Sequence, residues 1–114
     1  MTWRRLLFAL VVVGQLVVLY APRTPTTGGV PGVDKVAHVA VFALVVWAGL
    51  RAGVARPLVL LVSVVHAPVS ELLQATLLSN RSGELLDVVA DLLGCALGWL
   101  TAGWLAARRD MMVR

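Results

Sequence analysis

Residues 85–107 read LLDVVADLLGCALGWLTAGWLAA, and Asp87 and Asp91 are the only charged residues in this stretch. A helix needs roughly 20 apolar residues to cross the hydrocarbon core of a bilayer. Backbone N–H and C=O groups cannot stay unpaired in lipid, so an apolar run of this length is predicted to be a transmembrane helix. The stretch therefore predicts a membrane protein with two carboxylates inside one of its spans.

Three further apolar runs precede this stretch, separated by short polar breaks. Alternating polar positions, which a membrane β-barrel needs, are absent from these runs. The first run follows Arg4 and Arg5 like a signal peptide, but Pro22 directly after Ala21 makes a poor cleavage region, so we expect an uncleaved helix. The expected fold is an all-α, integral membrane four-helix bundle that forms one domain over residues 1–114, with an outer loop at 22–33 and helices at about 3–21, 35–51, 57–78 and 84–107.

Composition and charge narrow the class of protein further. Hydrophobic residues make up 60% of the chain and charged residues 14%, whereas soluble domains carry about 25% charged residues. The net charge is +4, but the basic residues punctuate the apolar runs instead of forming the contiguous basic face that nucleic-acid binding needs. Cys95 is the only cysteine, which excludes an intrachain disulfide. Membrane lipids are therefore expected partners, and nucleic acid is not.

The basic residues also predict the orientation in the membrane. Loops on the cytoplasmic side carry an excess of Lys and Arg. With the N-terminus inside, seven basic residues fall on the cytoplasmic side and three on the outer side, so both termini are expected in the cytoplasm. The seven are Arg4, Arg5, Arg51, Arg56, Arg108, Arg109 and Arg114, and the three are Arg23, Lys35 and Arg81.

Polar side chains gather at the outer ends of three predicted helices. With a rise of about 1.5 Å per residue, Glu71 and Asp91 lie roughly 10 Å and 9 Å inside their helices. Residues four apart share a helix face, which pairs Asp34 with His38 and Asp87 with Asp91. The polar set is Asp34, Lys35, His38, Glu71, Gln74, Arg81, Glu84, Asp87 and Asp91.

Small residues continue the face of the last helix that carries its two carboxylates. Gly94, Gly98 and Ala102 follow Asp87 and Asp91 at intervals of three or four residues. Such a stripe lets a second helix approach closely. A charge at the bilayer centre costs about 2.5–3.5 kcal/mol even on lenient scales. We therefore expect these carboxylates to point into the bundle.

The order of these motifs resembles the VanZ-like family of small bacterial membrane proteins. The first element is Asp34-Lys35-Val36-Ala37-His38 followed by Phe42, and the second is Glu71-Leu72-Leu73-Gln74 followed by Arg81, Asp87 and Gly94 to Gly98. The resemblance covers roughly residues 33–100. The family usually has Asn four residues after its helix-four Asp, where this chain has Asp91, so the site gains a carboxylate. The family's name comes from a protein associated with low-level resistance to teicoplanin.

The resemblance implies a bacterial plasma-membrane protein with an outward-facing polar pocket. The pocket is expected to bind an anionic or lipid-linked envelope molecule, such as a cell-wall precursor or a lipoglycopeptide, and to alter susceptibility to teicoplanin-type drugs. Lys35 and Arg81 would hold a phosphate or carboxylate. No cofactor is expected, and a homo-oligomer stays open. The expected ligand-binding residues are Lys35, His38, Glu71, Gln74, Arg81, Asp87 and Asp91.

Other interpretations stay open. His38 with Glu71 or Asp87 could act as general acid and base on a lipid phosphate or ester, although Ser70 and Ser82 lack the glycines of a nucleophile elbow. The same groups could instead form a purely structural ion-pair network.

Two further interpretations concern metal and protons. His38, Glu71, Asp87 and Asp91 could bind a metal, but their spacing matches no standard site, so no metal site is predicted. A small proton-coupled transporter subunit would rely on His66, the one residue that could bridge the two halves of the bundle. A lone histidine such as His66 is more simply expected to be hydrogen-bonded in packing, on a face shared with Ser63 and Ser70.

Overall fold

The computed structural model describes residues 2–21, 32–77 and 85–113. The described chain is all-α, and its four helices are α1 (Trp3–Tyr20), α2 (Val33–Arg51), α3 (Arg56–Leu77) and α4 (Leu85–Val113). Each helix is long and apolar enough to cross a membrane. The predicted four-helix bundle is confirmed, and the chain has the build of a multi-pass membrane protein.

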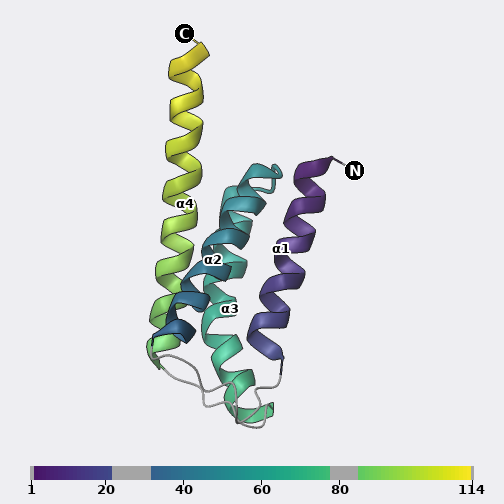
Figure 1. Ribbon diagram of the computed structural model, residues 1–114, viewed down its shortest axis with the longest axis vertical. Coiled ribbons are helices and arrows are strands. Elements are labelled where there is room, and N and C mark those ends of the chain that lie inside the picture. The colour runs from purple at the N-terminus through teal and green to yellow at the C-terminus, as the bar shows by residue number, and fades with distance from the viewer. Residues whose placement is uncertain (1, 22–31, 78–84, 114) are drawn as a thin grey trace.

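The helices alternate in direction, so both chain ends lie at the same end of the bundle (Figure 1). We call this the termini end. At the opposite end, α2 and α4 begin and α1 and α3 finish. A tight turn after Arg51, in which Gly53 has a positive φ of 86°, joins α2 to α3 at the termini end. A left-handed residue of this kind favours glycine because it has no Cβ.

Helix α4 is longer than the sequence predicted. The expected helix finished near residue 107, whereas α4 continues to Val113. The prediction followed the apolar run, and a run of apolar residues marks the part of a helix that lies in hydrocarbon. Arg108, Arg109, Met111 and Met112 are good helix formers, so the helix continues past the apolar stretch.

Helices α2 and α4 form the closest pair in the bundle. A Cβ atom added to Gly94 would collide with the carbonyl oxygen of Val39, and one added to Gly98 would collide with the backbone of Ala43. Ala102, which continues the stripe, is buried. The small-residue face predicted for this helix is therefore confirmed, and it is what brings the two backbones together.

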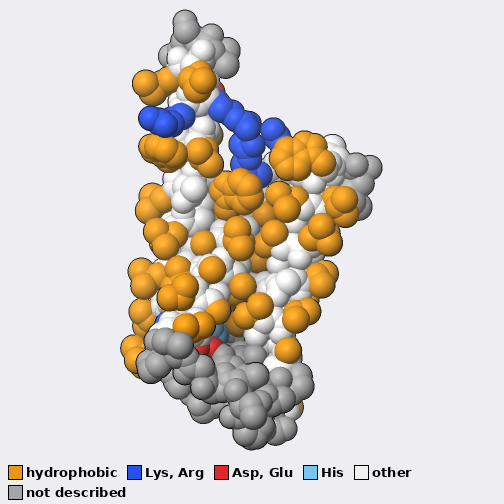
Figure 2. Space-filling view, in the orientation of Figure 1, with side chains coloured by type: hydrophobic (Ala, Val, Ile, Leu, Met, Phe, Trp, Pro, Cys, Tyr) orange, Lys and Arg blue, Asp and Glu red, His pale blue; other side chains and the backbone are white. Residues whose placement is uncertain are grey.

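The apolar core is thin and most large apolar side chains face outward. The buried hydrophobic cluster consists of Leu19, Phe42, Val46, Val59, Ala67 and Cys95. Hydrophobic side chains cover most of the face shown in Figure 2. This pattern is what a bilayer requires, because lipid chains solvate the outer surface while the bundle interior can hold polar groups.

Basic side chains gather at the termini end. Arg4, Arg51 and Arg56 line one hollow there, and Figure 2 shows Lys and Arg side chains together towards this end. The guanidinium carbon of Arg108 lies 4.6 Å from the centre of the Trp104 ring, and that of Arg4 lies 5.7 Å from the Trp3 ring. Paired aromatic and basic residues of this kind are typical of a membrane interface.

Candidate functional site

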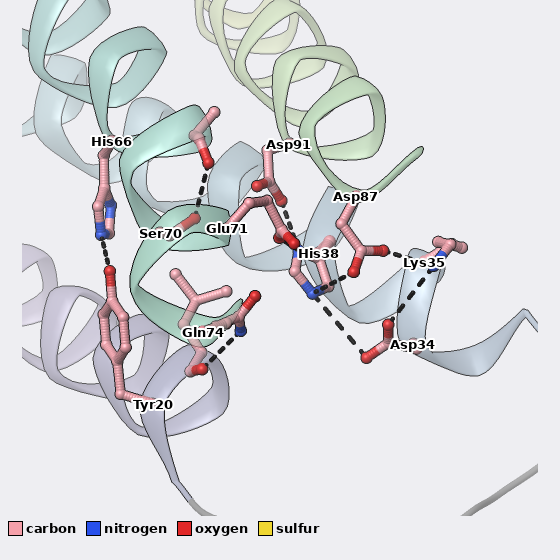
Figure 3. A network of polar contacts seen from close by, with 12 residues as sticks. Tyr20, Asp34, Lys35, His38, His66, Ser70, Glu71, Gln74, Asp87 and Asp91 are labelled. Carbon is pink, nitrogen blue, oxygen red and sulfur yellow. Dashed lines mark hydrogen bonds and ion pairs between the residues drawn. The ribbon is translucent and has the colours of Figure 1, made fainter. Parts of the chain in front are cut away.

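A histidine lies at the centre of the polar cluster that the sequence predicted. His38 is 1% exposed. Carboxylates from α2, α3 and α4 surround its ring (Figure 3), and they belong to Asp34, Glu71, Asp87 and Asp91. We use the name His38 cluster for His38 together with Asp34, Lys35, Glu71, Asp87 and Asp91. It joins α2, α3 and α4 near the end opposite the termini.

The two nitrogens of the His38 ring face different partners. Nδ1 lies 2.7 Å from Oδ1 of Asp91 and 3.7 Å from Oε1 of Glu71. Nε2 lies 3.8 Å from Oδ2 of Asp87 and 3.9 Å from Oδ1 of Asp34. Only the Asp91 contact is short enough for a hydrogen bond. The ring is thus held by Asp91 and flanked by carboxylates on both sides.

Local geometry explains how these side chains meet. Asp34 lies one turn before His38 on α2, and Asp87 lies one turn before Asp91 on α4, so each pair projects from one helix face. The contact of Gly94 with Val39 brings α4 against α2 at this level. A short aspartate side chain on α4 can therefore reach the imidazole of α2.

Lys35 is the lysine of the His38 cluster and lies beside two of its carboxylates. Its Nζ atom lies 2.6 Å from Oδ1 of Asp87 and 3.7 Å from Oδ2 of Asp34. The Lys35 side chain is 32% exposed and that of Asp87 is 5% exposed. The ammonium group therefore lies at the rim of the cluster, on the Nε2 side of His38.

Gln74 is buried, but its amide is directed to α1. Its Nε2 donates a hydrogen bond of 2.6 Å to the carbonyl oxygen of Leu19. Leu19 lies in the last turn of α1, where carbonyl oxygens have no partner within the helix. Gln74 was a predicted ligand-binding residue, and the structure gives its amide a contact that joins α3 to α1.

His66 lies one layer away from the cluster and is hydrogen-bonded in packing, as the sequence predicted. Its Nε2 lies 2.8 Å from the Tyr20 hydroxyl, and its ring centre lies 5.6 Å from that of Phe42. The Ser70 hydroxyl donates to the carbonyl of Ala67. Sequence reasoning missed Tyr20, because a single tyrosine near a helix end gives no signal of its partner on a distant helix.

Two predicted polar residues lie outside the described chain. Arg81, a predicted ligand-binding residue, and Glu84 fall between the described ends of α3 and α4. Within the described residues the cluster therefore carries four carboxylates against Lys35 and His38.

An apolar groove runs beside the cluster between α2 and α4. It has a volume of about 360 Å³ and begins at Lys35. The other lining side chains are Val36, Val39, Leu86, Val89, Ala90 and Leu93. The cluster thus has a charged rim that continues directly into an apolar surface on the lipid-facing side of the bundle.

Comparisons with protein-family models, with curated proteins and with solved structures find no match. The fold and the site by themselves define a polytopic membrane protein with a buried, histidine-centred acidic cluster at one end.

Proposed function

We propose that this chain is a VanZ-like protein of the bacterial plasma membrane that binds the phosphate head group of an envelope lipid at its outer face. The termini end would lie in the cytoplasm, as the excess of Arg residues there suggests. The observation that carries the proposal is the position of Lys35 at the start of an apolar groove between α2 and α4. A cation beside an apolar groove suits an amphiphile with an anionic head and a hydrocarbon tail.

The ion pair of Lys35 with Asp87 is compatible with this role. A lysine ammonium group has three donors, and the 2.6 Å contact with Asp87 uses one of them. The carboxylate would hold the ammonium at the rim and limit its freedom before the lipid arrives. In the VanZ-like pattern Arg81 would supply a second cation for the same head group.

The tail of the lipid would follow the groove. Val39 and Leu93 line it about one helical turn or more from Lys35 towards the termini end, and its walls are almost entirely apolar. Burial of apolar surface contributes about 25 cal/mol per Å². The tail therefore adds affinity, whereas the head group decides which lipids bind.

Lipid binding can be measured on the purified protein by native mass spectrometry with phosphatidylglycerol and with an uncharged diacylglycerol. Loss of one charge-assisted hydrogen bond costs about 1.5–3 kcal/mol, so Lys35→Met should weaken phospholipid binding by about tenfold or more. Arg108→Met, which removes a cation near the termini end, is the matched control and should bind as wild type. Equal phospholipid binding by wild type and Lys35→Met would contradict the proposal.

The proposed consequence is altered susceptibility to teicoplanin-type drugs. A sensitive bacterium would express wild type, Glu71→Gln or Arg81→Ala at matched membrane levels. Raised resistance with wild type alone would support a role of the cluster in the cell envelope. No change with any of the three proteins would separate lipid binding from drug resistance and would reject this consequence.

A second candidate function is acid–base hydrolysis of a lipid phosphate or ester. The observation in its favour is the 2.7 Å contact of His38 with Asp91. A carboxylate that accepts from Nδ1–H leaves Nε2 as the basic nitrogen, and Nε2 faces Asp34 and Asp87. Steady release of head group that is lost in His38→Ala would decide for an enzyme. Binding without turnover would decide for the lead proposal.

A further inference from the structure

The Nδ1 side of His38 brings together three side chains that are common metal ligands. His38, Glu71 and Asp91 come from α2, α3 and α4, and they are 1%, 6% and 0% exposed. One ligand atom of each lies within 4.8 Å of one ligand atom of each other. The sequence offered these side chains as metal ligands but predicted no metal site, because ligands from three helices leave no standard spacing along the chain.

A second observation at this position concerns Asp91. Its Oδ1 contacts His38, but its Oδ2 has no hydrogen-bond partner among the described residues, and the side chain is fully buried. Figure 3 shows the Asp91 carboxylate close to the side chains of His38 and Glu71. A buried carboxylate oxygen without a partner is costly. A cation between these three side chains would remove that cost if the Asp91 carboxylate bound it through both oxygens, Oδ1 beside His38 and the unpartnered Oδ2.

The charge of the cluster favours a cation as well. Four carboxylates face one lysine and one histidine in the described part of the chain. A low-dielectric interior penalises charges that are not balanced. A divalent cation would lower the net negative charge that these side chains place in the bundle interior.

The position of Lys35 decides on which side of the ring a cation can lie. Asp34, His38 and Asp87 also bring ligand atoms within 4.8 Å of one another. However, the Lys35 ammonium lies 2.6 Å from Asp87 and 3.7 Å from Asp34, so a second cation there would be repelled.

We infer that Nδ1 of His38 and the carboxylates of Glu71 and Asp91 bind a divalent transition-metal ion, with Zn²⁺ as the first candidate. An imidazole ligand favours Zn²⁺ and its neighbours over Mg²⁺ and Ca²⁺. The inference does not depend on lipid binding. It goes beyond the proposed function, because it assigns an inorganic ligand to the buried side of the cluster.

The other ring nitrogen fits the same assignment. A histidine that binds a metal through one nitrogen usually donates its second N–H to a carboxylate, which orients the ring. Nε2 of His38 lies 3.8 Å from Oδ2 of Asp87, so the ring would have to move towards Asp87 to donate this bond, and Asp87 is itself paired with Lys35. Bound Zn²⁺ would replace the proton between His38 and Asp91, and their 2.7 Å contact would lengthen to about 3.3 Å, the separation of ligands with bonds of about 2.0 Å in a tetrahedral site.

Zinc titration of the purified full-length protein in detergent tests this inference. After chelator treatment, calorimetry with Zn²⁺ alone should show one site per chain. Asp91→Asn and Glu71→Gln should each weaken binding by roughly tenfold or more, since even outer-shell changes cost that much. Asp110→Asn, the same substitution in an exposed part of α4, should bind as wild type, and Asp34→Asn should weaken binding less than Asp91→Asn.

Several outcomes would overturn the inference. These are no Zn²⁺ binding by wild type, unchanged binding in both Asp91→Asn and Glu71→Gln, or a larger loss in Asp34→Asn than in Asp91→Asn. If circular dichroism shows that the variants do not fold, X-ray absorption at the zinc edge of the wild-type protein still decides. A single imidazole with oxygen ligands supports the site, and a shell without imidazole rejects it. Because no lipid is added, these results are independent of the lipid-binding assay.

Discussion

At the scale of single residues, the buried polar groups divide into those that join helices and those that form the His38 cluster. Gln74 belongs to the first kind, because its amide donates to an unsatisfied carbonyl of α1. Asp91 belongs to the second kind, because it contacts the imidazole of His38. Each assignment leads to a substitution with a defined expected effect.

Substitution of Gln74 should loosen the contact between α1 and α3. Gln74→Leu keeps a similar volume but leaves the Leu19 carbonyl without its donor, which should cost about 1–3 kcal/mol. Thermal unfolding in detergent, followed by circular dichroism, measures the loss. Thr76→Val is the matched control, because Thr76 is exposed and its hydroxyl donates to the carbonyl oxygen of Leu72 in its own helix. Equal stability of Gln74→Leu and Thr76→Val would contradict this role.

Substitutions of Asp91 should separate its hydrogen bond from its charge. Asp91→Asn keeps a carbonyl oxygen that can accept from His38. We expect Asp91→Asn to fold with stability close to wild type. Asp91→Leu leaves the buried imidazole of His38 without its acceptor and should lose about 1–3 kcal/mol.

The same unfolding measurement compares the two Asp91 variants. A similar loss for both would show that the negative charge, and not the hydrogen bond, stabilises the fold. Asp91→Asn is also the variant in which zinc binding should weaken while the fold persists. If Asp91→Asn is as stable as wild type, its weaker zinc binding reflects the loss of a ligand and not the loss of the fold.

At the scale of helices, the pairing of α2 with α4 positions the site. Gly94 and Gly98 let the α4 backbone reach the carbonyls of Val39 and Ala43, and this approach places Asp91 beside His38. A wider separation of the two helices would leave the aspartate out of reach of the imidazole. The small-residue stripe is therefore a condition for the cluster.

Addition of one methyl group to the stripe should test this condition. Gly98→Ala puts a Cβ into the backbone of Ala43, and overpacking of this kind costs about 1–3 kcal/mol. Gly103→Ala on the same helix meets open space, so it should be neutral or stabilise by up to about 1 kcal/mol through helix propensity. In thermal unfolding of the two variants side by side, Gly98→Ala should lower the melting temperature, and Gly103→Ala should leave it unchanged or raise it. Two shifts of the same sign and size would contradict the close packing.

At the scale of the whole molecule, the cluster and the basic residues lie at opposite ends. The cluster lies where α2 and α4 begin, and Arg4, Arg51 and Arg56 share a hollow at the termini end. This separation makes the charge of the bundle asymmetric, and the positive-inside rule predicts from this asymmetry which end lies in the cytoplasm. The proposed outward-facing lipid site depends on that direction.

Cysteine labelling in intact cells should establish the orientation. In a Cys95→Ala background, Val33→Cys at the start of α2 should react with a membrane-impermeant maleimide added outside. Ala52→Cys, in the turn between α2 and α3, should react only after the cells are opened. The reverse pattern would place the His38 cluster on the cytoplasmic side and would reject the proposed outer-leaflet ligand.

Much of this architecture could be predicted from local pattern. The apolar runs predicted four membrane-length helices because hydrophobicity over about 20 residues depends only on the run itself. Helical periodicity predicted that Asp34 and His38 share one helix face and that Asp87 and Asp91 share another. The Gly94–Gly98 stripe predicted a closely packed neighbouring helix. The end of α4 was wrong, because helix propensity continues where hydrophobicity stops.

The sequence by itself determined which polar residues lie at one end of the bundle and which helices carry them. The tertiary structure alone decided that His38 faces Asp91 and Glu71 through one nitrogen and Asp87 and Asp34 through the other, that Lys35 lies on the Asp87 side, and that Gln74 contacts the Leu19 carbonyl. These contacts depend on how four helices are rotated and crossed relative to one another. Ridge-and-groove packing over the whole bundle sets those rotations, and no single stretch of sequence contains that information.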